Sequence, residues 1–309
     1  MTTFITFSLS HIHLMASILG SLALFMWSSL ALLAAKTTNI PAFFILSCAF
    51  FVSFGLSLLW RYQQEKHWFA SPKLTVKQWL FGIVGLFGYH FCYFFALQFA
   101  PVLEVTLINY LWPLLLTLLL AQRGQRLFAL SGGITAFIGI VVLLSGGQAT
   151  FTQQDLVGYL LALGAAIIWA SYSAYLSKGK SNTADIGWLS LAVALLAAIC
   201  HLLFEPAINI EQLTTVKWLY LLLIGLGPLG GSFYLWEYGL SKGNHRLLAS
   251  LSFFTPLCAS LLLAIFAMAT WSIEMAAALT LILLGGLITH MPSVLDNYRQ
   301  RLSVDKVTS

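Results

Sequence analysis

Long apolar stretches alternate with short polar connections along almost the whole chain. Ten of these stretches are close to the ~20 residues that a helix needs to cross the hydrocarbon core of a bilayer. They are residues 14–35, 41–61, 77–100, 103–121, 126–146, 155–178, 185–204, 216–241, 246–269 and 271–290. The connections at 100–103 and 269–271 are tight hairpins. The pattern predicts an all-α membrane protein with ten transmembrane helices.

The amino-acid composition agrees with a membrane protein and bears on which partners are expected. Apolar residues make up 60% of the chain and charged residues only 8%, whereas soluble domains have about 45–50% and about 25%. The net charge of +5 therefore belongs to the loops of a membrane protein, and no nucleic-acid partner is expected. The cysteines all lie in apolar stretches without metal-ligand spacing, so we expect no metal, no disulfide framework and no cofactor. They are Cys48, Cys92, Cys200 and Cys258.

The basic residues predict the orientation. If the N-terminus is cytoplasmic, thirteen of the fifteen Lys and Arg residues lie inside and only Lys36 and Lys217 lie outside. Cytoplasmic loops carry such an excess of positive charge. We therefore expect both termini, and the polar tail at 292–309, to be cytoplasmic.

The fourth span carries an unusual centre, because Pro113 lies in its middle, just after Asn109, Tyr110 and Trp112. A proline inside a helix removes a backbone hydrogen bond, here the one to the carbonyl of Asn109. In hydrocarbon that carbonyl must face protein or a water-filled cavity. Two other spans are interrupted in the same way, by Pro228 within Gly-Pro-Leu-Gly-Gly and by Pro256. We expect these three breaks to be the points at which helices bend during gating.

The break pattern repeats along the chain. The matching positions are Asn109 with Ser252, Tyr110 with Phe253 and Pro113 with Pro256 at an offset of 143, and Trp27 with Trp169 and Lys36 with Lys178 at an offset of 142. Two nearly equal offsets indicate a duplicated unit of five spans. Because five is odd, the second copy must enter the membrane inverted, as in many secondary transporters. We expect a 5+5 inverted repeat, with one unit at 1–148 and the other at 149–291.

Aromatic and polar side chains near the membrane midplane are the candidates for substrate binding. They are Trp27, Tyr89, His90, Tyr93, Asn109, Tyr110, Trp112, Trp169, Tyr234, Ser252 and Phe253. Trp and Tyr usually gather at the membrane interfaces, where we expect Trp60, Trp68, Trp79, Trp188, Trp218 and Trp271. Aromatic rings at depth indicate a cavity that stacks a flat or apolar substrate, although the same rings could serve only to pack helices.

Ionisable groups inside a membrane are candidates for ion coupling. His90 is the one that we expect at full depth, and no Lys or Arg lies deep. Glu104 opens the fourth span and Glu237 is near the end of the eighth, so we expect both carboxylates to reach water. No His, Asp, Glu or Ser groups have the spacing of a nucleophile or a metal site, so an enzyme is not expected.

These residues resemble the drug/metabolite transporter superfamily in its ten-helix form with two EamA-type repeats, and within it the aromatic amino-acid exporters. Three runs carry the resemblance: Glu104-Val105 through Asn109-Tyr110-Leu111-Trp112-Pro113, Tyr159-Leu160-Leu161-Ala162 through Ile168-Trp169-Ala170-Ser171-Tyr172, and Gly243-Asn244 with Phe253-Phe254-Thr255-Pro256. The resemblance implies a monomeric secondary transporter of the bacterial inner membrane. It would export aromatic or other neutral amino acids by alternating access, through a cavity between spans 1, 3, 4, 6, 8 and 9.

Other functions stay open at this point. An exporter of drugs or cationic metabolites would have the same architecture but would favour a deep carboxylate. A sugar-phosphate or nucleotide-sugar carrier would need a deep Lys or Arg for the phosphate. A channel is disfavoured, because inverted repeats with interrupted helices suit alternating access.

Overall fold

The computed structural model describes residues 2–69, 71–145, 149–179, 185–266 and 272–308. Within them, ten helical spans are long and apolar enough to cross a membrane, which confirms the predicted number. The hairpin at 269–271 with Trp271, and the expected boundary between the halves at residue 148, lie outside the described residues.

Half of the spans are single helices and half are divided. The single helices are α3 (Ala42–Glu65), α8 (Arg126–Ser145), α9 (Leu156–Leu176), α10 (Ile186–Phe204) and α15 (Ile273–Thr308), which continues through Pro292. The divided spans are α1 (Thr2–Ser28) with α2 (Leu30–Ala34), α4 (Val76–Ile83) with the π-helix η1 (Val84–Gly88) and α5 (Tyr89–Phe99), α6 (Val102–Asn109) with α7 (Trp112–Leu120), α11 (Thr215–Leu226) with α12 (Gly231–Lys242), and α13 (His245–Leu251) with η6 (Ser252–Phe254) and α14 (Thr255–Ile265). Short 3-10 turns are η2 (Arg123–Gln125), η3 (Gln153–Asp155) and η5 (Ile210–Gln212).

The helix interruptions at the three prolines are confirmed. Pro113 and Pro256 lie in the first turns of α7 and α14, where a missing N–H leaves no helical bond unmade. The interruption at Pro228 needs a glycine beside it, because a Cβ on Gly230 would collide with the carbonyl oxygen of Gly225.

The π-helix in the third span was not predicted. It lies where Gly85 meets α9 so closely that a Cβ on Gly85 would collide with the ring of Tyr172. This tight contact depends on a residue far away in the chain, so no local sequence pattern announces it.

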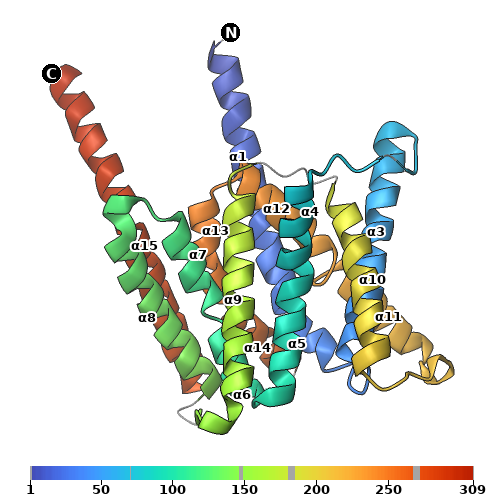
Figure 1. The fold of residues 1–309 in the computed structure, drawn as a ribbon. Coiled ribbons are helices and arrows are strands. Elements are labelled where there is room, and N and C mark those ends of the chain that lie inside the picture. The colour runs from blue at the N-terminus through green and yellow to red at the C-terminus, as the bar shows by residue number, and fades with distance from the viewer. Residues whose placement is uncertain (1, 70, 146–148, 180–184, 267–271, 309) are drawn as a thin grey trace.

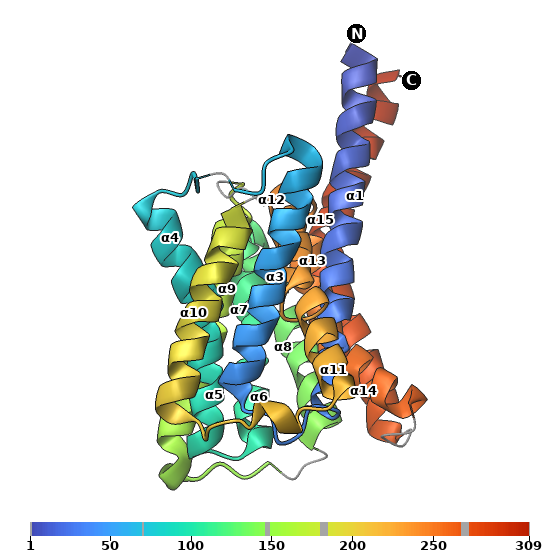
Figure 2. The ribbon, with the colours of Figure 1, turned by 90° about the vertical axis from the view of Figure 1, so that its right-hand side faces the viewer.

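The helices pair across the two halves of the chain. The main pairs are α1 with α12, α3 with α10, α5 with α9, and α8 with α15. The pair α8 and α15 lies at one edge of the bundle and the pair α3 and α10 at the other, as Figures 1 and 2 show. The start of α1 and the end of α15 project from the same side (Figure 1).

Glycines close two of these pairs. A Cβ on Gly20 of α1 would lie 3.1 Å from the Cα atom of Gly239 on α12. A Cβ on Gly132 of α8 would lie 2.5 Å from the carbonyl oxygen of Gly285 on α15. Small residues allow helix backbones to approach in this way, and this contact drives helix association in membranes.

Gly285 and its neighbour Gly286 provide a matched test of this contact. We expect Gly285→Val to destabilise the protein, because overpacking costs about 1–3 kcal/mol and here the nearest atoms include the backbone of Gly132 and Ala136. The Tm in detergent should fall by roughly 5 °C. Gly286→Val is the control, because no atom lies within 4 Å of its Cβ position. Equal losses in both variants would mean that the close approach of α8 and α15 does not matter for stability.

Candidate functional site

Five aromatic rings from four helices meet in the centre of the molecule, and we call them the aromatic cage. They are Trp27 of α1, Trp112 of α7, Trp169 of α9, and Phe233 and Trp236 of α12. The centroid of Trp27 lies 5.1 Å from that of Trp236 and 5.4 Å from that of Trp169, both edge to face. The sequence prediction thus named three cage residues, which the structure brings together.

Phe233 and Trp236 are the cage residues that the prediction did not select. They are three residues apart on α12, so they present their rings on one helix face. Trp236 is fully buried, and its indole N–H donates to the hydroxyl of Ser173 on α9 over 3.1 Å. Their position just after the Gly-Pro-Leu-Gly-Gly interruption was the signal that could have identified them.

The cage is closed in this conformation. Trp112 and Trp169 are each 4% exposed and Phe233 is 5% exposed, whereas Trp27 is only half-buried. Edge-to-face contacts of this kind stabilise aromatic pairs by about 0.5–1.5 kcal/mol beyond the burial of area. A flat ligand entering the cage must therefore replace contacts between these rings with contacts to itself.

A polar group lies beside the cage. The ring of Tyr89 lies 5.4 Å from Trp169, and its hydroxyl accepts a hydrogen bond from the Asn109 amide over 3.3 Å. The Oδ1 atom of Asn109 is buried and has no partner among the described residues. Tyr93 lies parallel to Tyr89, with centroids 6.2 Å apart. Because buried polar atoms normally have partners, the Oδ1 atom of Asn109 is an acceptor open to a ligand N–H.

His90 lies against the cage on the other side of Tyr89. Its Nδ1 atom lies 2.6 Å from the carbonyl oxygen of Leu86, so this nitrogen carries the proton and donates. Rings surround the imidazole, with centroids of Phe50 and Phe233 at 5.8 Å and 6.1 Å. The hydrogen bond to Leu86 fixes Nδ1 as a nitrogen that carries a proton, and the aromatic rings around the imidazole disfavour a charge on it.

Besides Tyr89, His90, Tyr93 and Asn109, four more predicted binding residues lie outside the cage. The hydroxyl of Tyr234 donates to the carbonyl of Ser53 on α3 over 2.9 Å, because Tyr234 follows Phe233 and so points to another face of α12. Ser252 donates to the carbonyl of Ala249. Phe253 belongs to a separate apolar cluster with Leu107, Ala136, Ile140, Leu257 and Ile282, against which Tyr110 packs. Substrate contact by these four residues stays a prediction.

The expectation that Glu104 and Glu237 reach water is wrong. Glu104 is 3% exposed and Glu237 is 1% exposed. Thr150, which precedes α9, lies against the start of α6, so one carboxylate oxygen of Glu104 accepts the N–H of Thr150 over 2.8 Å and the other is buried without a described partner. Glu237 directly follows cage residue Trp236 and lies in a small hollow beside Tyr172. Because both carboxylates are buried, they are stronger candidates for ion coupling than their positions near the span ends suggested.

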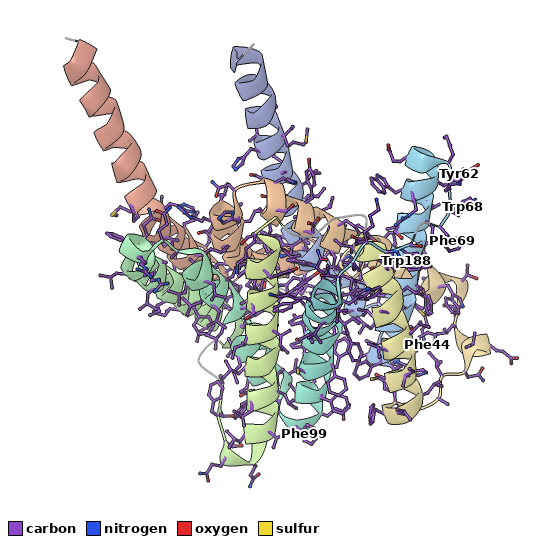
Figure 3. The ribbon with its side chains drawn as sticks, turned by 45° about the horizontal axis from the view of Figure 1, so that its top comes forward. Phe44, Tyr62, Trp68, Phe69, Phe99 and Trp188 are labelled. Carbon is purple, nitrogen blue, oxygen red and sulfur yellow. The ribbon has the colours of Figure 1, made fainter. Side chains whose placement is uncertain are left out.

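Several peripheral tryptophans lie on the surface, as expected of interfacial residues. Trp60, Trp68 and Trp218 are 51%, 46% and 41% exposed. Trp68 stacks on Tyr62 with ring centroids 4.4 Å apart, and Figure 3 shows this pair at the end of α3. Within the described part of the chain, no three His, Cys, Asp or Glu residues are grouped so that they could hold a metal ion.

Known proteins resemble this chain over most of its length. It is 35% identical over 294 residues to the aromatic amino acid exporter YddG of Ancylobacter novellus. The aligned region covers 89% of this chain and 97% of that protein. The proteins of the same name from Salmonella typhimurium and Escherichia coli are 25% and 24% identical, over 67% and 60% of this chain and 74% and 67% of those proteins. A solved crystal structure, 34% identical, has a TM-score of 0.82 and covers 89% of this chain and 96% of that chain.

The description of a protein family matches the second half of the chain. Residues 156–291 match the EamA-like transporter family, whose members are transporters and not enzymes. This match agrees with the ten membrane spans and with a relative that is 35% identical over 89% of the chain. The chain therefore belongs to the EamA-like transporter family and is a multi-pass membrane transporter.

Proposed function

We propose that this protein exports aromatic or other neutral amino acids across the bacterial inner membrane by alternating access. The observation that carries the proposal is the aromatic cage, in which rings from α1, α7, α9 and α12 meet within their spans and not at the span ends. Rings set edge to face can bind a planar side chain between them. The names of the relatives, aromatic amino acid exporters, agree with such a cargo.

The two parts of an amino acid would bind to two parts of the site. The side chain takes the place of ring contacts around Trp27, which is the least buried cage residue. The ammonium group donates to the open Oδ1 atom of Asn109, which is joined to the cage through Tyr89. The helix interruptions next to these residues allow half-helices to tilt, so that the site faces one side of the membrane and then the other.

The proposal includes an inverted repeat, with units at 1–148 and 149–291. Helices α6 and α13 begin at Val102 and His245, and α7 and α14 begin at Trp112 and Thr255, an offset of 143 in both cases. The π-helix begins at Val84 and the break in the eighth span at Gly227, with the same offset. After each break a hydroxyl donates back to the proline carbonyl, Thr117 to Pro113 over 2.7 Å and Ser260 to Pro256 over 3.0 Å.

The helix pairs support the same symmetry. Exchanging the two halves turns the pair α1 and α12 into the pair α9 and α5, and leaves the pairs α3 with α10 and α8 with α15 as they are. We further propose that the protein works as a monomer. We also propose that both termini lie in the cytoplasm, because the loops on that side carry most of the Lys and Arg residues. A reporter fused to either end should be cytoplasmic, and a periplasmic signal at one end alone would contradict the arrangement.

Substrate exchange in liposomes tests the function. Purified protein is reconstituted with unlabelled substrate inside, and uptake of labelled tryptophan, phenylalanine, leucine, alanine and a lipophilic cation is measured. We expect the aromatic amino acids to exchange fastest. Exchange of the cation alone would overturn the proposal.

One observation favours a second candidate, an exporter of drugs or cationic metabolites. The carboxylate of Glu237 is buried and lines a hollow with Tyr172 and Tyr175, on another face of α12 than Trp236. A carboxylate beside aromatic rings is suited to a bound cation. In the same set of substrates, Glu237→Gln should then abolish cation exchange and leave exchange of aromatic amino acids unchanged.

We expect transport to be driven by the substrate gradient without proton coupling, because export of a metabolite that accumulates inside needs no second driving force. The aromatic rings around His90 also disfavour a charge on its imidazole. Vesicles with equal substrate on both sides and an imposed pH difference should show no net accumulation, for the wild type and for His90→Gln alike. Accumulation that disappears in His90→Gln would show instead that His90 carries the proton.

A further inference from the structure

A hollow of about 520 Å³ lies at the ends of α4, α7 and α9, away from the aromatic cage. It lies on the opposite face of α9, since Ser171 and Lys178 line it and are exposed, whereas Trp169, Tyr172 and Leu176 are buried towards the centre. At about 100° per residue, Ser171 points roughly 200° away from Trp169. The hollow is therefore separate from the proposed substrate path and opens towards the surroundings of the protein.

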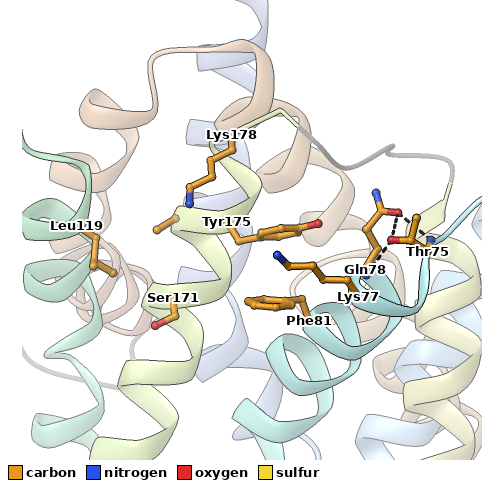
Figure 4. A pocket seen from close by; sticks show the side chains of 9 residues that line it. Thr75, Lys77, Gln78, Phe81, Leu119, Ser171, Tyr175 and Lys178 are labelled. Carbon is orange, nitrogen blue, oxygen red and sulfur yellow. Dashed lines mark hydrogen bonds between the residues drawn. The ribbon is translucent and has the colours of Figure 1, made fainter.

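Two lysines from distant parts of the chain converge on this hollow. Lys77 comes from the first turn of α4 and Lys178 from just beyond the end of α9, and Figure 4 shows both amino groups directed into the space between the helices. None of the described residues that line the hollow is acidic. Two ammonium groups without a carboxylate between them attract an anion to this position.

Aromatic and aliphatic side chains line another part of the hollow, beside the polar residues Thr75, Gln78 and Ser171. The rings of Phe81 and Tyr175 stack with centroids 5.0 Å apart, and the amino group of Lys77 lies 5.8 Å from the centroid of Phe81. Phe81 and Leu119 are 39% and 56% exposed although both lie in membrane spans. Their exposed faces meet hydrocarbon chains, while the lysines lie at the end of the spans. The ligand that matches this surface has an anionic head and an apolar tail.

We propose that this hollow binds an anionic phospholipid, with its phosphate between Lys77 and Lys178 and an acyl chain along Phe81 and Leu119. Basic pockets between helices on the cytoplasmic side are suited to such head groups. The inference uses the proposed orientation, in which both lysines are cytoplasmic, and does not depend on the substrate.

Native mass spectrometry of the purified protein with added phosphatidylglycerol or phosphatidylcholine tests the site. Lys77→Gln/Lys178→Gln should weaken phosphatidylglycerol binding about tenfold or more, because each lysine contributes separately to attraction of an anionic lipid. Phosphatidylcholine binding should not change. The matched control is Lys66→Gln/Lys242→Gln, which removes two charges from the same end of the bundle outside the hollow, and it should bind as the wild type does.

A third variant separates charge from folding. Lys77→Arg/Lys178→Arg keeps both positive charges and should keep phosphatidylglycerol binding. Equal weakening in the glutamine variant and in its control would reduce the effect to net charge and overturn the site, as would unchanged binding in the glutamine variant. Displacement of the lipid by millimolar inorganic phosphate would show a site for free anions instead of lipid.

Discussion

Trp112→Ala should reduce exchange of tryptophan and phenylalanine by about tenfold to one hundredfold. The scale comes from proteins that bind nucleic acids, where loss of an aromatic ring under a stacked base costs about 1–3 kcal/mol. The ring of Trp112 lies 6.3 Å, 6.4 Å and 6.2 Å from those of Trp27, Trp169 and Trp236. A small substrate such as alanine does not reach every wall, so its exchange should change little. Initial rates of exchange in liposomes measure both.

Two further variants show whether the ring binds substrate or only packs helices. Trp112→Phe keeps an aromatic wall and should retain most of the activity, while Trp60→Ala removes an exposed tryptophan and should change nothing. Removing a buried tryptophan costs about 3–5 kcal/mol of stability, so the folded amount is measured by size-exclusion chromatography. Poor folding with equal losses for all substrates would favour packing alone.

Asn109→Leu should raise the KM for aromatic amino acids by about tenfold or more, because a buried hydrogen bond to a charged group contributes about 1.5–3 kcal/mol. Leucine has a similar size but offers no acceptor to an ammonium group. The wild type should prefer phenylalanine to 3-phenylpropionate, which lacks the ammonium, and the variant should lose this preference.

Tyr89→Phe is the control for this prediction, because it removes the hydroxyl to which Asn109 donates and leaves the amide in place. We expect it to keep the preference for phenylalanine. If Asn109→Leu also keeps it, the ammonium binds elsewhere, and the open acceptor of Asn109 has a structural role.

The sequence predicted the spans and the break points because each depends on local chemistry. Apolar length predicts a span, and a proline in the middle of an apolar span favours an interruption there, although α15 continues through Pro292 nearer its end. Trp27, Trp112 and Trp169 could be found because a proline or an internal repeat marks them. Phe233 and Trp236 follow the glycine-rich break in the sequence. Selecting them as binding residues in place of Tyr234 required knowing which face of α12 meets α1 and α9.

The depth of the acidic residues could not be predicted, for a similar reason. Hydropathy places Glu104 at the edge of a span, but its burial depends on the backbone of Thr150, which lies 46 residues further along the chain. The π-helix depends on the approach of Gly85 to Tyr172. Such contacts join segments that are distant in sequence, and the residues around each contact carry no local pattern that predicts it.

The pairing of helices across the halves has a consequence for how the protein is made. Helix α1 leaves the ribosome long before its partner α12, which begins only at Gly231, and α8 must wait for α15 at Ile273. Until then the facing glycines Gly20 and Gly132 have no backbone to meet, and lipid covers them. Within the first half, helices such as α7 and α8 can already pack together, but we expect the whole bundle to close only when synthesis of the second half is nearly finished.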